Sequence, residues 1–115
     1  MGKPVSWFEI NSSGHDELHA FYSKVFGWKI DGVGNGYGVV DTTSSKGIAG
    51  GIGPAQGPNQ VTFYIEVADL EKALKSVEAN GGKTVVPITE IPDLVTFAQF
   101  ADPEGNVVGL FKGEG

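Results

Sequence analysis

The second half of the chain repeats the pattern of the first half, and this internal duplication limits the folds that the chain can adopt. Aligned without gaps, the segment from Trp7 to Gly27 lies over the segment from Thr62 to Gly82. Few residues are identical, but both segments run from a strand pattern through an amphipathic helix to a glycine and a further strand. A duplication of this kind predicts two similar modules packed together.

Each half opens with a predicted strand whose two faces differ in character. In the strand from Val5 to Ile10, Phe8 and Ile10 share one face, whereas Trp7 and Glu9 share the other. We expect the apolar face to lie under the following helix and the mixed face to line a small-molecule cleft, with a solvated face or a dimer interface as alternatives. The second strand alternates in the same way, with Val61, Phe63, Ile65 and Val67 on its apolar face and Thr62, Tyr64 and Glu66 on its mixed face.

A predicted helix follows each opening strand and ends at a glycine. The first helix runs to about Phe26 and stops at Gly27, and Ser13 with Asp16 resembles a capping box at its start. Asp69 is a good N-cap for the second helix. The spacing of apolar residues predicts one apolar stripe on each helix, made of Leu18, Phe21, Tyr22 and Val25 in the first and of Leu70, Ala73, Leu74 and Val77 in the second.

The chain of 115 residues is short enough to form one domain. The clearest linker is the run of Gly, Pro and polar residues from Gly53 to Asn59. We therefore predict a single domain, residues 1–115, with a first module at about 4–53, a linker at about 54–59 and a second module at about 60–113.

Composition excludes several classes of function. The chain has no cysteine, its eight basic residues are all lysine, and its net charge is −6. Nucleic-acid binding needs a basic face, which this composition does not supply, so we expect no nucleic-acid partner. No apolar run approaches the roughly 20 residues of a membrane span, so we expect no membrane partner. The absence of cysteine suits a reducing compartment and leads us to expect a cytoplasmic location.

Several segments resemble one known superfamily. The most specific are the helix end from Phe21 to Trp28, with Phe-Tyr followed by Phe-Gly-Trp, and the Asp-Pro-Glu-Gly-Asn turn from Asp102 to Asn106. The chain resembles the vicinal oxygen chelate superfamily, which includes glyoxalases, bleomycin-resistance proteins and ring-cleaving dioxygenases. The resemblance covers nearly the whole chain, and it implies an α+β fold of two tandem βαβββ modules whose curved mixed sheets enclose a cleft.

The resemblance also says where a metal would be bound. In metalloenzyme members each module supplies one ligand from its first strand and one from its last, and the ion polarises vicinal oxygens of the substrate. Carried over, these positions are Trp7, Gly50, Thr62 and Gly109, none of which is a usual ligand for Zn, Ni, Mn or Fe. We therefore predict no metal site and no cofactor, as in the bleomycin-resistance proteins, whose dimers sequester a drug in their clefts.

Two carboxylates lie on the predicted cleft face. Glu9 and Glu66 are the candidate catalytic residues, because a carboxylate in an apolar cleft can act as a base; the alternative is a solvated strand glutamate. His15 and His19 could chelate a metal, being four residues apart on a helix, but both flank its apolar stripe, so we expect a boundary role. The candidate ligand-binding residues are Trp7, Thr62, Tyr64, Phe97, Gln99, Gly109 and Phe111, with core or dimer contacts as the alternative.

Three functions remain open on the sequence. The leading hypothesis is a metal-independent protein that binds an apolar or aromatic organic molecule, as a homodimer. The second is a lyase, isomerase or dioxygenase-like enzyme that acts on a vicinal-oxygen substrate, with a cleft glutamate as base or with a non-standard metal site. The third is a dimeric interaction module in which the cleft is only a dimer seam.

Overall fold

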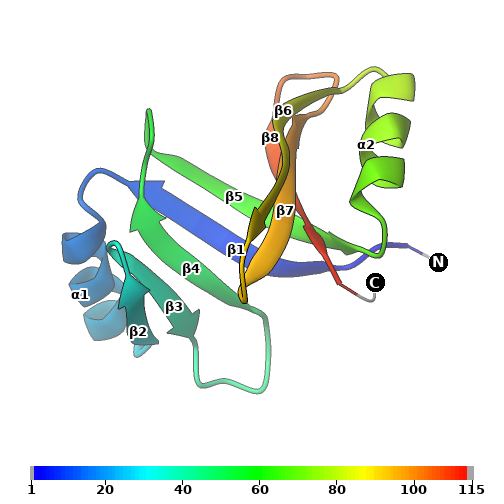
Figure 1. Ribbon diagram of the computed structural model, residues 1–115. Coiled ribbons are helices and arrows are strands. Elements are labelled where there is room, and N and C mark those ends of the chain that lie inside the picture. The colour runs from blue at the N-terminus through cyan, green and yellow to red at the C-terminus, as the bar shows by residue number, and fades with distance from the viewer. Residues whose placement is uncertain (1, 114–115) are drawn as a thin grey trace. The chain divides into compact units, whose positions relative to one another are not determined.

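The computed structural model describes residues 2–113, and the chain divides into two compact units. The first unit is Trp7–Thr62, and the second contains the described residues 2–6 and 63–113. Each unit holds one helix and part of the strand set drawn in Figure 1. The boundary between the units falls inside the first and the fifth strand, so the short N-terminal segment belongs with the second unit.

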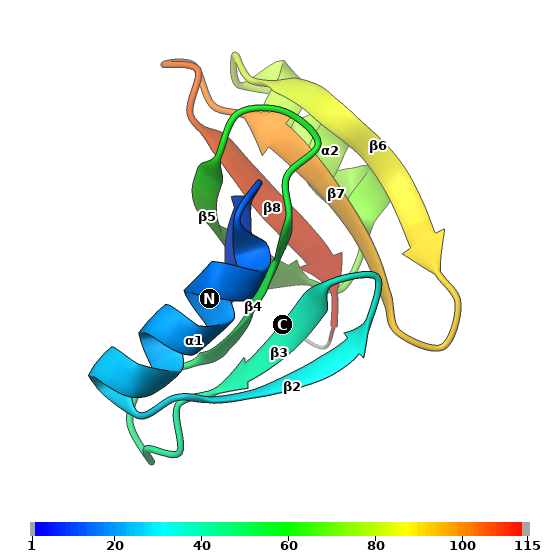
Figure 2. The same cartoon turned by 90° about the vertical axis from the view of Figure 1, so that its left-hand side faces the viewer.

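In the first unit one helix covers a sheet with the strand order β2-β3-β4-β1. The first strand, β1, runs parallel to β4, and the remaining pairs are antiparallel. Figure 2, in which the helix α1 faces the viewer, shows it beside β4 with the β2–β3 hairpin next to it. The elements are β1 (Val5–Ser12), α1 (His15–Phe26), β2 (Lys29–Gly34), β3 (Tyr37–Asp41) and β4 (Ala49–Pro54).

The second unit repeats this connectivity, with the strand order β5-β8-β7-β6. Here β5 runs parallel to β8, and the other two pairs are antiparallel. The predicted α+β fold of two βαβββ modules with curved sheets is thereby confirmed (Figure 1). The elements are β5 (Gln60–Val67), α2 (Leu70–Ala79), β6 (Lys83–Ile91), β7 (Val95–Ala101) and β8 (Val107–Lys112).

The helix of each unit packs on the sheet face that the sequence predicts. In the first unit Ile10 belongs to a core with Val40 and Ile52, and Phe8 and Leu18 pack against it. The helix therefore lies over the face of Phe8, not that of Trp7. The core of the second unit contains Val67, Leu70, Leu74, Ala98 and Leu110.

Two apolar residues of β5 that the strand pattern places under a helix are exposed. Val61 is 75% exposed and Phe63 is 41% exposed, whereas Thr62 and Tyr64, on the other face, are buried. The helix α2 contacts β6, β7 and β8. Of the β5 residues, only the later ones, Ile65 and Val67, belong to the core that packs against α2 or lie next to it. The prediction of one continuous buried apolar face on this strand is therefore wrong for its first half.

The start of α1 also differs from the prediction. Its N-cap is Gly14, which has no side chain to cap the helix, so the capping box predicted from Ser13 and Asp16 is wrong. Instead the Gly14 N–H donates to the Ser12 hydroxyl at 3.3 Å. The predicted cap of α2 is confirmed, because the Asp69 carboxylate accepts from the Lys72 N–H at 3.0 Å.

Between the two modules of the sequence, β4 ends at Pro54 and β5 begins at Gln60. The predicted linker at 54–59, the module boundaries and the folding of the whole chain as one domain stay predictions. None of the helices within residues 2–113 has the length and apolar character needed to cross a membrane.

Candidate functional site

Strand register places the candidate site residues of each unit on the sheet face opposite its helix. In the first unit Glu9 pairs with Gly51 across β1 and β4, and Trp7 lies two residues earlier on the same face. In the second unit, register and strand alternation put the predicted residues on one face: Tyr64, Glu66, Phe97, Gln99, Gly109 and Phe111. Thr62, the last residue of the first unit, points to the same side of β5 as Tyr64, two residues later.

The carboxylate of Glu9 is held by two donors on one oxygen. Its Oε1 accepts from the Tyr37 hydroxyl at 2.6 Å and from the Trp7 indole Nε1 at 3.1 Å. Among the described residues, Oε2 of Glu9 has no hydrogen-bond partner, and this atom is not buried. The side chain is thus oriented by its neighbours while one oxygen stays open to an incoming donor.

Sequence reasoning missed Tyr37, which orients Glu9. Its ring lies over Gly51 and Gly53, where an added Cβ would collide with ring atoms of Tyr37. Alternate residues of a strand point to the same face, so these two glycines leave a bare strip of β4 for the ring. The spacing of the two glycines was the one signal in the sequence that could have indicated a side chain packed across this strand.

In the second unit another tyrosine, Tyr64 of β5, packs on a glycine of a neighbouring strand. Its ring lies on Gly109, whose added Cβ would collide with it, and its hydroxyl accepts from the Gln99 amide at 2.9 Å. Phe97 meets the ring edge to face, with 6.4 Å between centroids. Because Tyr64 is only 7% exposed, it presents little surface to a ligand. Thr62, at the end of the first unit, is buried as well.

Glu66 has a setting different from that of Glu9. Its Oε1 accepts from the Ser6 hydroxyl at 3.0 Å, and its backbone N–H donates to the Pro4 carbonyl at 2.9 Å. The carboxyl end of the side chain lies against Gly113, where an added Cβ would collide with it. The N-terminal segment thus packs onto β5 at this carboxylate.

The residues at the metal-ligand positions of the resembled superfamily do not fit a metal. Gly50 faces the ring of Phe8 on the helix side, and the β4 residues on the face of Trp7 are Ala49, Gly51 and Gly53. None of these residues supplies a side-chain ligand atom. Trp7, Thr62 and Gly109 supply no usual ligand either. Across residues 2–113 no group of three His, Cys, Asp or Glu side chains gathers as a metal site would require.

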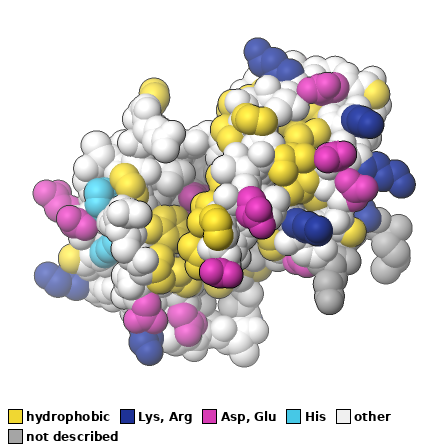
Figure 3. Space-filling view, in the orientation of Figure 1, with side chains coloured by type: hydrophobic (Ala, Val, Ile, Leu, Met, Phe, Trp, Pro, Cys, Tyr) yellow, Lys and Arg dark blue, Asp and Glu magenta, His cyan; other side chains and the backbone are white. Residues whose placement is uncertain are grey.

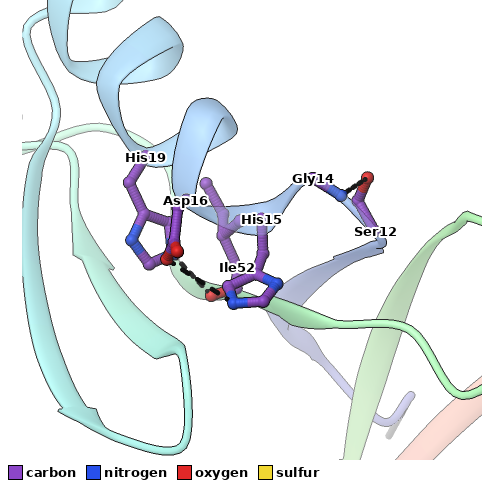
Figure 4. A network of polar contacts seen from close by, with 6 residues as sticks. All are labelled: Ser12, Gly14, His15, Asp16, His19 and Ile52. Atoms are coloured by element: carbon purple, nitrogen blue, oxygen red, sulfur yellow. Dashed lines mark hydrogen bonds and ion pairs between the residues drawn. The ribbon is translucent and has the colours of Figure 1, made fainter.

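The two histidines of α1 pack against the sheet of the first unit. His19 Nε2 lies 2.9 Å from the Ile52 carbonyl, and His15 Nε2 lies 3.5 Å from the Asp16 carboxylate. Figure 4 shows both rings reaching from α1 toward the strand that carries Ile52. An added Cβ on Gly36 would collide with the His15 ring, so this ring rests on the β2–β3 turn. This is the predicted boundary role.

A groove of about 260 Å³ lies in the first unit on the helix side of the sheet, away from Glu9. Apolar side chains of β1 and α1 form part of its wall, and polar residues near the start of β5 form the rest. The lining residues are Ile10, Asn11, Ser12, Leu18, Tyr22, Asn59, Gln60 and Val61.

Comparison with known proteins identifies the family. Residues 5–110 match the model of the Glyoxalase/Bleomycin resistance protein/Dioxygenase superfamily. The chain belongs to this superfamily. A glyoxylase-like domain-containing protein of Didymella fabae is 30% identical, over 89% of this chain and 88% of that protein. The match covers nearly the whole chain, as expected from the sequence resemblance.

Solved structures of the superfamily share the fold. Methylmalonyl-CoA epimerase from Mycobacterium tuberculosis is similar with a TM-score of 0.66 and 11% identity, over 96% of this chain and 88% of that one. The Mn(II)-bound glyoxalase from Novosphingobium aromaticivorans gives a TM-score of 0.68 and 19% identity, over 94% of this chain and 37% of that one. At these identities the likeness concerns the fold alone.

Proposed function

We propose that this superfamily member binds a small organic molecule on the Trp7 face of its first unit. The ligand carries an aromatic or apolar ring together with a cationic or hydrogen-bond-donating group. The observation that carries the proposal is the Glu9 carboxylate, whose Oε1 is held by Tyr37 and Trp7 while its Oε2 is open. A carboxylate fixed in this way accepts a donor without losing much side-chain entropy on binding.

Binding without metal chemistry follows from the residue types on this face. Trp7 and Tyr37 offer aromatic surface, which stacks on planar rings and attracts cations. Trp7 and Gly50 stand at the two positions of this unit that the resemblance assigns to metal ligands, and neither side chain can hold an ion that would polarise a carbonyl. The expected outcome is affinity rather than turnover.

Fluorescence of Trp7 provides the test. A panel of aromatic amines and their uncharged analogues would be titrated into the protein, with Trp28 as a constant background. Glu9→Gln keeps the shape of the side chain but removes its charge, so we expect the Kd of a bound amine to rise by about tenfold or more. Tyr37→Phe frees the carboxylate to rotate, and we expect a smaller rise of about threefold to tenfold.

Glu71→Gln is the matched control, because this exposed glutamate lies on α2 of the second unit. It should leave the Kd unchanged. The proposal is wrong if no compound of the panel changes the fluorescence of the wild type. It is also wrong if Glu9→Gln and Glu71→Gln have the same effect on binding.

A second candidate function is proton transfer next to a carbonyl, with Glu9 as the base. The same open Oε2 favours it, since a base needs one free oxygen within reach of the substrate. The similarity to an enzyme described as an epimerase is consistent with it. Incubation of 1,2-dicarbonyl or β-keto compounds in D2O would test this function by NMR. Deuterium uptake that depends on Glu9 would favour the enzyme, and its absence would favour the binding protein.

The other expectations from the sequence belong with this proposal. We propose that the protein works without a cofactor, binds neither nucleic acid nor membranes, acts in the cytoplasm and forms a homodimer. The acidic charge of −6 supports the absence of a nucleic-acid partner.

A further inference from the structure

The helix α1 is unusual because none of its residues is buried. In α2, by contrast, Leu70 and Leu74 are buried in the core. A helix of a globular protein is stabilised mainly by burying an apolar stripe, so α1 leaves much of its apolar surface without a partner in the chain.

The exposed surface of α1 carries large apolar side chains, two of them from its predicted apolar stripe. Phe21 is 52% exposed, Val25 is 55% exposed, and Phe26 at the helix end is 60% exposed. The stripe members Phe21 and Val25 are therefore not covered within the single chain. Phe21 also packs edge to face on Tyr22, with 5.2 Å between centroids, so its ring is held in place.

The second unit supplies an internal control for this exposure. In the gap-free alignment of the two halves, Phe21 corresponds to Ser76 and Val25 to Asn80. Both counterparts are exposed polar residues on α2 or at its end. The same position of the same module is polar where the helix faces solvent, so the apolar residues of α1 indicate a surface that is covered.

The charges on α1 indicate that the partner of this exposed surface is the same helix of a second copy. The first turn carries Asp16 and Glu17, and the last turn carries Lys24. Figure 3 shows this arrangement over α1, with acidic side chains at one end and a lysine at the other. When two copies of α1 pack antiparallel about a two-fold axis near Ala20, Glu17 of each copy faces Lys24 of the other. The surface is thus complementary to itself in charge.

The groove beside α1 offers a place for an aromatic anchor from the second copy. Leu18 and Tyr22 of α1 form part of its wall, and the exposed Val61 forms another part. Apolar cavities of about 150 Å³ hold a benzene molecule. A groove of about 260 Å³ therefore has room for one phenyl ring. Leu18 and Tyr22 flank Phe21 in the sequence of α1, so the groove borders the exposed apolar surface of this helix.

We propose that the outer face of α1, formed by Glu17, Ala20, Phe21, Lys24 and Val25, is a homodimer interface in which two copies pack antiparallel and each Phe21 enters the groove of the other copy. The interface lies on the helix side of the sheet and leaves the face of Trp7 and Glu9 uncovered. It is therefore independent of the proposed ligand binding, and either proposal can fail without the other.

Sedimentation of the full chain at micromolar concentration tests the interface. The wild type should sediment at twice the chain mass. Phe21→Ser, which installs the residue type found at the same place in α2, should raise the dimer Kd by at least about tenfold, because buried aromatic anchors dominate such interfaces. Leu94→Ser is the control, since Leu94 is 73% exposed but lies between β6 and β7, and it should leave the Kd unchanged.

A charge swap tests the antiparallel geometry. Glu17→Lys alone and Lys24→Glu alone place like charges opposite each other and should weaken the dimer. The double variant restores the pairing in reversed order and should recover the affinity of the wild type. If both single variants and the double variant dissociate equally, the proposed arrangement is wrong.

Because the chain contains no cysteine, a single introduced thiol reports on the two-fold axis. Ala20→Cys places the same thiol of both copies beside the axis, so mild oxidation should give a disulfide-linked dimer. Lys75→Cys, at the matching position of α2, should stay monomeric on a denaturing gel. A monomeric wild type at micromolar concentration, or a dimer that neither Phe21→Ser nor the charge variants weaken, would overturn the proposal.

Discussion

Tyr37 and Tyr64 each lie over a glycine of the last strand of their unit, and this pairing fixes both aromatic rings. The glycine is Gly51 in the first unit and Gly109 in the second. Each of these glycines pairs with a β1 or β5 residue of the candidate face, Glu9 in one unit and Tyr64 in the other. The two rings come from different strands, because Tyr37 lies on β3 whereas Tyr64 lies on β5 at the place that Glu9 holds in β1. In the first unit the ring also donates a hydrogen bond to the Glu9 carboxylate.

Replacing Gly51 by alanine should disturb the candidate site directly. The new Cβ would collide with the hydroxyl and the ring of Tyr37, so the ring has to move and its hydrogen bond to Glu9 is lost. We expect a loss of about 1–3 kcal/mol in the free energy of unfolding, as for other overpacked sites, together with weaker binding of an aromatic amine. Urea unfolding and the Trp7 titration would measure the two effects.

Gly57→Ala is the matched control for this prediction. Nothing lies within 4 Å of a Cβ added at Gly57, and its backbone is not in the left-handed region. Its unfolding free energy should stay the same or rise by about 0.4–1 kcal/mol, because alanine restricts the unfolded chain. Equal stability of the two variants would show that the ring of Tyr37 moves aside at no cost.

The sequence predicted the position of a site residue only where strand alternation determines which face of the sheet the residue occupies. Alternation correctly placed Trp7 and Glu9 on the face opposite α1, because a period of two needs no tertiary information. It could not find Tyr37, whose contact with Glu9 depends on the register of β3 against β4. The Gly50 position was implied by the family resemblance, and Gly50 lies on the face of Phe8, opposite to that of Trp7.

At the scale of elements, the turn between β7 and β8 contains a carboxylate whose pKa is lowered by hydrogen bonds. The Asn106 side chain donates to both oxygens of Asp102, at 3.3 and 2.9 Å. This contact, followed by the backbone N–H of Asn106, lowers the pKa of Asp102 below its usual value. A lowered pKa means that the turn gains stability above the usual carboxyl value and loses it as the pH falls through the folded-state value.

Asn106→Ala should raise the pKa of Asp102 toward its usual value of about 3.9. NMR titration of the Asp102 carboxyl carbon would measure this change. The variant should be less stable than the wild type at neutral pH, and the difference should shrink below about pH 4, where the unfolded-state carboxyl is protonated. Asn80→Ala, at the end of α2, should leave the titration unchanged. An Asp102 pKa that stays low in Asn106→Ala would contradict the assigned cause.

The order and type of the elements followed from the sequence, whereas their burial did not. Glycine stops and the Asp69 cap act within a few residues, so the end of α1 at Phe26 and the start of α2 were predicted correctly. The exposure of Val61 and Phe21 depends instead on which distant parts of the fold pack against them. A pattern of apolar residues indicates a face that packs against a partner. It does not show whether that partner is the rest of the same chain or a second copy of the chain.

At the scale of the whole molecule, the compact units do not coincide with contiguous halves of the sequence. The residues before Trp7 belong with the second unit, although the duplicated pattern assigns them to the first module. The contacts that join them are the Pro4 carbonyl, which accepts from the Glu66 N–H at 2.9 Å, and the Ser6 hydroxyl, which donates to the Glu66 carboxylate at 3.0 Å. The sequence repeat therefore identifies the two modules. It does not show that the first residues of β1 pack with the second unit.

Removal of the residues before Trp7, with an initiator methionine in their place, should therefore weaken the second unit. Glu66 would lose two hydrogen bonds, each of which contributes about 0.5–1.5 kcal/mol or more when a charged group takes part. In hydrogen exchange, the Glu66 amide should lose protection while the β2–β3 hairpin of the first unit keeps it. Ser6→Ala, which removes only the side-chain bond, should have a smaller effect on the unfolding free energy. If the Glu66 amide keeps its protection in the truncated chain, the N-terminal segment does not stabilise the second unit.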